Sequence, residues 1–473
     1  MKGRLLPVAA LSVSAVAAHA SRAQQMPVRA EGVTATKGDT LRLDLPRSIE
    51  IALRNATPVQ LGTDTARLSG IALLESYGRF LPNVNTTIGG FDQRGLSLLS
   101  GTALVASDAQ FYGLQYTLST SVNLFNGFRD REHMRAMLGA RDAASNSLDR
   151  AKQQVSFDVA QSFYQLVLDR RLASVAEANL ALSKAREDQL SEQVNAGTKA
   201  PPDLYRQQAQ ARADEVAVID AKNRVDNDES ALVIRLRLDP KRAYSFTEPA
   251  ADTARLSSAD LDVNALNGQA LRARPDLLSA RNRVTADEHE MRAAHGEYLP
   301  QIALRFDDVG AGRVFGRELV DGKDQLTIGQ RSVGTQLGDQ RYGVLSLGAS
   351  WSLFDGYRAR FDVERAAVAA DRDRLNVEDL QLRIGGELET AIGNYRAADQ
   401  KLVATAAAVD AAQQAFDAVS GRYDVGLASV VDVLTAQTAL TQARALREQA
   451  IANMALQKAV LRYATGSSPI LSP

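Results

Sequence analysis

The chain has 473 residues, 45% of them hydrophobic, and a formal net charge of −1. This length allows two or three ordinary domains or one elongated domain. The near-neutral charge argues against nucleic acid as a partner, because no cationic excess is available to neutralise phosphates. The sequence has no cysteine, which excludes disulfides, thiolate chemistry, thiolate zinc sites and a lipid-bearing N-terminal cysteine.

The N-terminus reads as a secretory signal peptide over residues 1–23. A short basic start precedes the apolar stretch Leu5–Ala18 and the small-x-small cleavage site Ala18-His19-Ala20, and Ser21–Ala23 offers an alternative cut. The apolar stretch is too short to span a bilayer, and no run of about 18 apolar residues follows it. We therefore expect an exported protein that is periplasmic, secreted or inserted in the outer membrane as β-structure, since only helices and closed barrels satisfy their backbone in lipid.

Short motifs recur at two constant offsets along the chain. Gly78–Pro82 (GRFLP) recurs as Gly296–Pro300 (GEYLP), 218 residues later, and Leu124–Arg129 (LFNGFR) recurs as Leu353–Arg358 (LFDGYR), 229 residues later. The second offset also relates Gly197 to Gly426, Asp203 to Asp432 and Gln208 to Gln437. Offsets this constant indicate a tandem duplication. We divide the chain into a signal peptide (1–23), a first repeat (24–250), a second repeat (251–466) and a C-terminal tail (467–473).

Each repeat is predicted to begin with a helix and to continue into a pair of strands. The helices span about Arg47–Tyr77 and Asn264–Glu297 and end just before the Leu-Pro pairs at Pro82 and Pro300, because proline disfavours helix in the preceding residue. The strands alternate polar and apolar residues with the pattern of transmembrane β-strands, which need about 9–11 residues. The first strand of each pair contains Val84–Ile88 or Gln301–Phe306, and the second strand contains Leu114–Val122 or Val344–Trp351.

The change of offset from 218 to 229 places 11 extra residues between Pro300 and Leu353. Glycines recur there among polar residues, namely Gly310, Gly312, Gly316, Gly322, Gly329, Gly334 and Gly338. We predict a loop in this segment, because loops tolerate insertions.

A Phe-x-Gly turn at Gly127 and at Gly356 leads into a very long helix in each repeat, followed by a return helix. The second repeat carries the seven-residue period of a coiled coil. The long helix has Leu402, Val409, Phe416 and Tyr423 seven apart, with Thr405, Ala412 and Val419 three residues after the first three. The return helix keeps the period at Val433, Leu440, Met454 and Leu461, interrupted at Arg447. These stripes predict helix packing rather than a cofactor site.

The long helices are predicted to reverse at Gly197 and Gly426, because a left-handed glycine is a common way to end a helix. In the second repeat Ser429 fits the N-cap of the return helix and Asp432 its third position, which is a capping box. In the first repeat Pro201 fits the first helical position and Asp203 the third.

Apolar residues also flank the second turn. Val425 and Leu427 lie beside Gly426, where a solvated tip would normally carry polar residues, and they suggest a docking knob for another protein.

No pattern in the sequence indicates an enzyme, a cofactor or a metal. His289 and His295 are six residues apart and do not share a helical face, so a metal site is not expected among the neighbouring glutamates. Gly310-Ala311-Gly312 lies in the predicted loop and precedes no Rossmann helix. No nucleophile elbow or pair of catalytic carboxylates stands out.

Two strands per repeat give four per chain, whereas the smallest bacterial barrel has about eight. An open sheet edge in lipid leaves backbone groups unpaired, so the strands must be shared among subunits. Three chains would give twelve strands, and the two repeats would give the helices quasi-sixfold symmetry. Closed strand pairing therefore requires an oligomer, but it does not fix the number of subunits at three.

The order of elements, the two Phe-x-Gly turns and the motif Tyr423–Leu434 (YDVGLASVVDVL) together resemble the TolC family of outer-membrane efflux proteins, from about Leu41 to Gly466. The resemblance implies an α+β, mostly α fold, in which a homotrimer forms a twelve-stranded β-barrel and a coiled-coil α-barrel across the periplasm. It implies a passive exit duct in contact with outer-membrane lipid. Its expected partners are a periplasmic membrane-fusion adaptor and an inner-membrane pump of the resistance-nodulation-division or ABC type.

The resemblance also implies roles for the tips of the helices. The adaptor would dock on the tip residues Val425, Gly426, Leu427, Ser429 and Gly197. The entrance or gate would be formed by Asp432, Asp203, Tyr423 and Arg422. Purely structural roles stay open at this point: Asp432 caps its helix in any case, and Tyr423 also continues the heptad seam.

The chain departs from the family pattern in three places. It lacks the lipid-bearing cysteine of many drug-efflux members, it has Thr435 where some members carry a second acidic residue, and its first tip carries Pro201-Pro202. The cargo is left open between small molecules and secreted proteins. The alternative function is a periplasmic coiled-coil scaffold or adhesin without a pore, which would have no need of lipid-length strands.

Overall fold

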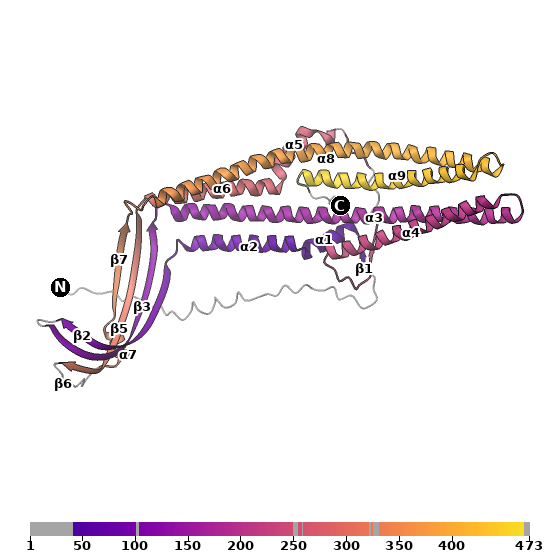
Figure 1. Ribbon diagram of the computed structural model, residues 1–473. Coiled ribbons are helices and arrows are strands. Elements are labelled where there is room, and N and C mark those ends of the chain that lie inside the picture. Colours follow the sequence, from indigo (N-terminus) through magenta and orange to yellow (C-terminus); the bar gives the residue numbers. More distant parts are fainter. Residues whose placement is uncertain are drawn as a thin grey trace.

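The computed structural model describes residues 41–100, 104–248, 254–257, 259–320, 323–324 and 331–467. The molecule is elongated: long helices run side by side, and a curved sheet leaves one end of them at a steep angle (Figure 1). Most of the described chain is helical, which confirms the predicted mostly α class. The predicted signal peptide (1–23) and residues 468–473 of the predicted tail lie outside the described residues.

The two repeats have the same main elements in the same order. The first contains β1 (Leu41–Leu43), α1 (Leu45–Asn55), α2 (Thr57–Gly78), β2 (Asn83–Ser100), β3 (Leu104–Phe125), α3 (Arg129–Asn195), α4 (Pro201–Arg235) and β4 (Tyr244–Phe246). The second contains α5 (Val263–Ala273), α6 (Pro275–His295), β5 (Gln301–Val320), β6 (Lys323–Asp324), α7 (Val333–Asp339), β7 (Tyr342–Ser350), α8 (Arg358–Asp424) and α9 (Val430–Ala464). The lengths match closely: α3 and α8 each have 67 residues, and α4 and α9 each have 35.

The first predicted helix of each repeat is in fact two helices. Ala56 separates α1 from α2 with φ −63° and ψ 129°, and Arg274 separates α5 from α6 with φ −69° and ψ 120°. The prediction of one continuous helix is wrong because of Pro58 and Pro275. Proline lacks an N–H and fits only in the first turn of a helix, so a new helix has to start there.

The predicted strands are present and form one antiparallel sheet in the order β2-β3-β5-β7, with β6 paired to the far end of β5. Three of them are longer than predicted, since β2 has 18 residues, β3 has 22 and β5 has 20, whereas β7 has 9. A second, two-stranded parallel sheet of β1 and β4 lies beside the middle of the helices (Figure 1).

The glycine-rich segment predicted as a loop is largely regular structure, and that prediction is wrong. Gly310, Gly312 and Gly316 belong to β5, while Gly334 and Gly338 belong to α7. The helix α7 packs so closely on β5 that a side chain at Gly312 would lie 3.1 Å from the Val333 side chain. Glycine in a strand often marks such a close approach. Gly322 and Gly329 lie outside the described residues.

The helices form a wall with a definite order. The long helix α3 packs against α2 and α4 on one side and against α6 and α9 on the other, and α8 packs against α6 and α9. The shorter helices therefore stack in two columns, and the order across the wall is α2/α4, α3, α6/α9, α8 (Figure 1). Within the described residues α5 covers the outer side of α8 near its middle, and no further helix covers the rest of that side or the outer side of the α2/α4 column (Figure 1).

The predicted heptad seam lies in the contact between α8 and α9. Leu402, Phe416 and Tyr423 are buried on α8. On α9 the buried seam residues are Val433, Leu440, Met454 and Leu461. The coiled-coil prediction for this hairpin is thus confirmed.

Candidate functional site

Each helical hairpin ends in a tight turn at the end of the molecule that lies farthest from the sheet (Figure 1). In the α8–α9 turn, Gly426 has the left-handed φ of +79°. Its N–H donates to Tyr423 O at 3.0 Å, and the Leu427 N–H donates to Arg422 O at 2.7 Å, which is the Schellman arrangement. The Arg422 guanidinium also donates to Leu427 O at 3.2 Å. Gly426 therefore ends α8 as predicted.

The predicted capping box of α9 is present. The Asp432 N–H donates to Ser429 Oγ at 3.2 Å, and Asp432 Oδ2 accepts from the Ser429 N–H at 2.9 Å and from its hydroxyl at 2.8 Å. The backbone and then the hydroxyl of Ser429 lower the pKa of the Asp432 carboxyl, whose charge complements the helix dipole. Val425 and Leu427 are each 69% exposed, so two apolar side chains lie in solvent beside this cap.

The α3–α4 turn has the same backbone but a weaker cap. Gly197 has a φ of +72°, and its N–H donates to Val194 O at 3.0 Å. Pro201 is the first residue of α4 and Asp203 the third, both as predicted. The N-cap residue is Ala200, which has no side-chain oxygen to accept from the helix.

The two tips touch each other through a lysine and a tyrosine. The Lys199 Nζ lies 4.0 Å from the centre of the Tyr423 ring and donates to Tyr423 O at 3.3 Å. The ring packs in a small apolar cluster with Leu190 and Val430, so its role in the seam is confirmed. Burial, and then the charge of Asp203, raise the pKa of the Tyr423 phenol. The sequence did not reveal Lys199, because its position depends on which hairpins are neighbours.

A buried polar network joins α3, α4 and α9 between the tips and the middle of the helices. The Ser183 hydroxyl donates to Asp214 Oδ2 at 2.5 Å and accepts from Gln437 Nε2 at 2.8 Å. The same Gln437 amide donates to Asn179 Oδ1 at 2.9 Å. A satisfied polar group among apolar seams can fix the register of packed helices, and this network fixes how the two hairpins face each other. The sequence signalled only that Gln437 recurs from Gln208.

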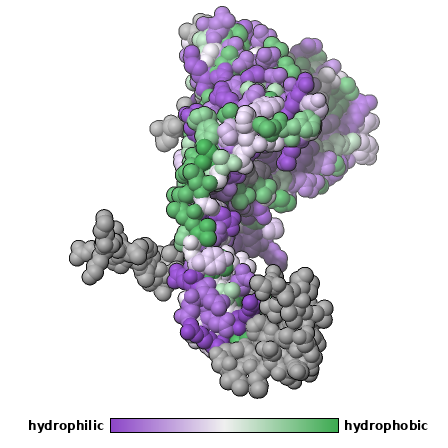
Figure 2. Space-filling model, turned by 90° about the vertical axis from the view of Figure 1, so that its left-hand side faces the viewer, coloured by the Kyte–Doolittle hydropathy of each residue, from purple (hydrophilic) through white to green (hydrophobic). Residues whose placement is uncertain are grey.

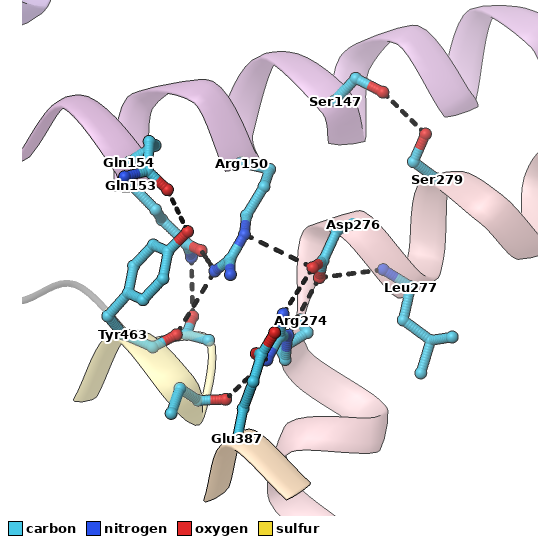
Figure 3. A network of polar contacts seen from close by, with 12 residues as sticks. Ser147, Arg150, Gln153, Gln154, Arg274, Asp276, Leu277, Ser279, Glu387 and Tyr463 are labelled. Carbon is cyan, nitrogen blue, oxygen red and sulfur yellow. Dashed lines mark hydrogen bonds and ion pairs between the residues drawn. The ribbon is translucent and has the colours of Figure 1, made fainter. Parts of the chain in front are cut away.

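In the middle of the wall α9 ends against the start of α6, and we call this contact the second junction (Figure 3). The Arg274 side chain is only 2% exposed. Its guanidinium donates to both carboxylate oxygens of Asp276, at 3.1 and 2.7 Å, to Glu387 Oε2 at 2.6 Å and to Ala464 O at 3.4 Å. Burial acts to lower the pKa of Arg274, but the two carboxylates outweigh it and raise it. Cations thus meet the carboxyl end of α9, and Asp276 lies at the amino end of α6, as the helix dipoles favour.

The equivalent contact of α4 with α2 is the first junction, and it is simpler. Arg237 ends α4 with a left-handed φ of +53° and donates to Thr57 Oγ1 at 2.6 Å. The residue 229 positions later is Gly466, with φ +80°, where a side chain would lie 2.9 Å from Arg274 Cα. Each junction therefore combines one arginine with one small residue, Arg237 with Ala56 and Arg274 with Gly466. The sequence pattern did not indicate either junction.

The predicted structural turns join the sheet to the helices. Pro82 and Pro300 stand immediately before β2 and β5. Gly127 and Gly356 precede α3 and α8 with left-handed φ values of +69° and +70°. Glycine adopts such values without a steric cost, which explains its place in both turns.

Apolar side chains predominate on one face of the sheet, which also carries Thr86, Thr120 and Asp308. Polar side chains predominate on the other face, which also carries Phe91, Val309, Tyr342 and Val344. The strand registers place these side chains on one face: Val84, Ile88, Leu114, Tyr116, Leu118, Val122, Leu304, Phe306, Leu345 and Leu347. The opposite face carries Asn85, Thr87, Gln115, Thr117, Ser119, Ser121, Arg305, Asp307 and Ser346. Figure 2 shows hydrophobic atoms gathered on the column of strands below the ends of the helices.

The open sides of the wall carry residues equivalent to a contact made inside the chain. The offsets map α3 onto α8 and α2 onto α6, so every α3–α6 pair has an equivalent pair in α8 and α2. Inside the chain Gly139 lies against Ala286. The equivalent residues, Val368 and Leu68, are 66% and 62% exposed.

The turns show the same relation. A side chain at Gly127 would lie 2.9 Å from Gly296 Cα, so these two glycines allow the backbones to meet. The equivalent glycines, Gly356 and Gly78, have open space around them among the described residues. Within the described single chain, α8 therefore carries the residues of one side of each contact and α2 those of the other side, and the two sides do not meet.

No group of three or more His, Cys, Asp or Glu side chains is placed to hold a metal ion in the described part of the chain. None of the helices described here has the length and apolar character needed to cross a bilayer.

A sequence model of the family described as "Outer membrane efflux protein" matches residues 266–467. The chain is 24% identical over 345 residues to the outer membrane efflux protein BepC of Brucella suis, covering 72% of this chain and 70% of that protein. It is also 24% identical over 358 residues to the outer membrane protein TolC of Escherichia coli, covering 74% and 69%.

Solved structures have the same fold. The outer-membrane channel OprN superposes with a TM-score of 0.74 at 19% identity, over 90% of both chains. CusC, described in terms of transmembrane channel formation, gives 0.75 at 16% identity, over 92% of this chain and 96% of that one. The outer membrane protein VceC of Vibrio cholerae gives 0.74 at 18% identity, over 90% and 96%.

Proposed function

We propose that this chain, which matches the outer membrane efflux protein family over residues 266–467, is a member of the TolC family and forms a homotrimeric exit duct of a tripartite efflux or type I secretion system. It is an outer-membrane channel with a large periplasmic portion. It conducts substrates passively, since energy comes from an inner-membrane pump, and it has no enzymatic role. The two repeats, 24–250 and 251–466, each supply half of a protomer's share of the duct.

The open sides of the wall carry this proposal. On α8 the exposed residues Phe361, Val368, Leu375 and Leu382 recur every seven positions. On α2 the exposed residues are Leu61, Leu68, Ile71 and Leu74. Single exposed apolar residues are ordinary, but a heptad stripe on an uncovered helix is the seam of a missing neighbour. The equivalence with α3 and α6 supports α2 of a second copy as that neighbour.

The sheet supports the same arrangement. Its edge strands β2 and β7 would pair between neighbouring copies, and three copies would supply a closed barrel of twelve strands. Its apolar face would meet lipid and its polar face would line water. A scaffold or adhesin without a pore would have no use for such a two-faced sheet.

The tips are the proposed periplasmic end. Val425, Gly426, Leu427 and Ser429, with Gly197 of the first tip, form the docking surface for a membrane-fusion adaptor. Asp432 and Asp203 bring negative charge to the entrance, where rings of carboxylates favour cations. Tyr423, held by Lys199, and Arg422, which closes its own turn, connect the entrance residues to the hairpins.

The pump is of the resistance-nodulation-division or ABC type, and specificity for the cargo lies mainly with pump and adaptor. A photo-reactive or thiol cross-linker placed at Leu427, which is 69% exposed, would identify the adaptor in cells. Recovery of the same partner from a chain labelled at Val216 on the side of α4 would contradict docking at the tip.

Cysteine cross-linking tests the assembly directly, because the chain has no cysteine of its own. The pair Leu68→Cys and Val368→Cys in one chain would form disulfides between copies and give a covalent species of three chains. The matched control is Leu68→Cys with Glu378→Cys, since Asp149, the equivalent of Glu378 on α3, is exposed. Cross-linking that is equal in both variants, or confined to one chain, would contradict the assembly.

A further inference from the structure

Two histidines and two glutamates cross the contact between α3 and α6 in a reciprocal pattern. The His133 Nδ1 lies 2.7 Å from Glu290 Oε1, and the His289 Nδ1 lies 2.7 Å from Glu132 Oε2. Each helix thus contributes one histidine and one adjacent glutamate, in opposite order. No metal site is expected from the sequence among His289 and its neighbouring glutamates, and in the structure His289 lies against a carboxylate on another helix.

The two pairs are protected to different degrees. Glu132 is 7% exposed and His289 16%, while His133 and Glu290 line an open hollow of about 1080 Å³ beneath the sheet. Asn123 and Gln301 lie at the end of this hollow nearest the strands. Protons therefore reach the His133–Glu290 pair from solvent, and the Glu132–His289 pair lies deeper in the same contact.

Other charged groups face the four residues from every helix packed here. Arg131 and Arg135 bind Glu132 at 2.9 and 3.2 Å, and the Arg292 guanidinium lies 3.2 Å from His289 Nδ1, the same ring nitrogen that faces Glu132. Charged groups from the surrounding elements are Arg79 after α2, Arg129 and Asp130 of α3, Asp287 and Glu288 of α6, Glu297, and Arg358, Asp362, Arg365, Arg372, Asp373 and Arg374 of α8. Most of these are paired with one another, as Arg129 with Glu297 at 2.9 Å and Arg374 with Glu288 at 2.7 Å.

We propose that His133, Glu290, Glu132 and His289 form a proton-responsive clasp, which tightens the α3–α6 contact beneath the sheet as the pH falls. Histidine changes charge between about pH 5 and 8. Once protonated, each imidazole donates to its glutamate as a cation, and such charge-assisted hydrogen bonds are about twice as strong as neutral ones.

The direction of the pH dependence follows from the charge that the glutamate carries. Burial acts to raise the pKa of Glu132, but hydrogen bonds from His289 and Arg131 and the charge of Arg135 outweigh it and lower the pKa. Glu132 therefore remains a carboxylate at a pH where histidine is protonated. The added stabilisation is present at acidic pH and is lost as the pH rises and the rings become neutral.

The clasp is specific to the contact inside the chain. On α8 and α2 the equivalents of Glu132 and His289 are Phe361 and Ile71, which are 64% and 54% exposed and form part of the open apolar faces. In the proposed assembly of several copies, the helix contacts around the tunnel would alternate between proton-responsive and apolar. Only this alternation depends on the proposed assembly. The clasp itself needs only one chain.

The test compares wild-type protein with the variant His133→Gln/His289→Gln, both full-length in detergent. The thermal midpoint is measured at about pH 5.5 and about pH 8, on either side of the range in which histidine titrates. We expect the variant to melt below the wild type at both values and the gap to be about 2–4 °C larger at the acidic one. A gap that is equal at the two pH values would overturn the clasp.

Two further variants make the result specific. His295→Gln removes the remaining described histidine, which lies beside the Tyr298 ring at the end of α6, and should leave the pH dependence as in the wild type. Glu290→Gln keeps both histidines, is at a half-exposed position that tolerates change, and should lose part of the acid-dependent gain. An unchanged gain in Glu290→Gln would contradict the proposal. Because melting is read on one chain or on the assembly alike, failure here is separable from failure of the cross-linking between copies.

Discussion

The contact between α3 and α6 and its equivalent on the open faces of α8 and α2 have diverged in a consistent direction. Inside the chain the contact is polar or tightly fitted, with Glu132 on His289 and Gly139 on Ala286. On the open faces the equivalents are Phe361 with Ile71 and Val368 with Leu68. A contact within one chain forms without the loss of translational freedom that association costs, so only the contact between chains needs large apolar side chains.

The hairpins differ in the same way. In the first hairpin Asp169 and Asp228 share a polar contact between α3 and α4, and the equivalents in the second are Ala398 and Gln457. The junctions differ too, since the arginine comes from the end of α4 in one and from the residue before α6 in the other. Two copies of one ancestral unit have thus acquired separate tasks at equivalent positions.

The largest effect is expected from charges on the open face. The double variant Phe361→Asp/Val368→Asp should prevent assembly, because each interface loses two apolar side chains worth about 1.5–3 kcal/mol each. Size-exclusion chromatography with light scattering would show single chains. The control Glu378→Lys on the same helix should assemble normally. Assembly of the double variant at wild-type concentrations would show that α8 is not the interface.

The two turn glycines should separate folding from assembly. Gly127→Ala combines a left-handed φ with a collision on Gly296 and should destabilise the chain itself by about 2–4 kcal/mol. Gly356→Ala meets open space in the single chain and should cost only about 1 kcal/mol there. Urea unfolding in the non-assembling Phe361→Asp/Val368→Asp background measures both. Equal losses would contradict the difference in surroundings.

The pH dependence of the first hairpin should be opposite in sign to that of a normal ion pair. Burial, and then the hydrogen bond and charge of Asp169, raise the pKa of Asp228 to about 6. The folded chain therefore holds this proton more tightly than the unfolded chain, and stability falls as the pH rises from about 4 to about 6. After screening by solvent the loss is about 1 kcal/mol. Asp228→Asn should flatten this part of the profile in urea titrations, and an unchanged profile would assign it elsewhere.

The smallest effect concerns the first junction. Arg237→Gly should stabilise the chain by about 0.5–1 kcal/mol, because glycine adopts the left-handed φ of +53° without a steric cost. The gain is reduced by the lost bond to Thr57 Oγ1. At the second junction Gly466→Ala should destabilise, since Arg274 occupies the space that a side chain needs. Thermal melts of the two variants that shift in the same direction would contradict this difference between the junctions.

Much of the fold could be predicted from periodicity and repetition. The offsets gave the order and equivalence of the elements, the Leu-Pro pairs marked where helices end, and Gly426, Ser429 and Asp432 fixed one tip to the residue. The turn and capping signals depend on a few neighbouring residues, and the offsets compare one repeat with the other without requiring any contact between elements. The breaks at Pro58 and Pro275 were also local, and the weight of proline in the first turn was underestimated.

The contacts that connect the elements could not be read in this way. Lys199 on Tyr423, Ser183 on Asp214 and Arg274 on Glu387 join residues far apart in the chain, and their geometry depends on the order of helices across the wall. The glycines of β5 gave a misleading signal, because a loop and a strand under a packed helix require the same small residue. The roles of the tip residues in docking and gating stay predictions.

Single-channel conductance in planar bilayers tests the central claim most directly. Purified trimer locked by the Leu68→Cys/Val368→Cys disulfide should conduct in discrete, cation-favouring steps, and Asp203→Ala/Asp432→Ala in the same background should conduct with reduced preference for cations, because the carboxylates at the entrance are removed. A covalently confirmed trimer that inserts and never conducts, in either form, would contradict an exit duct.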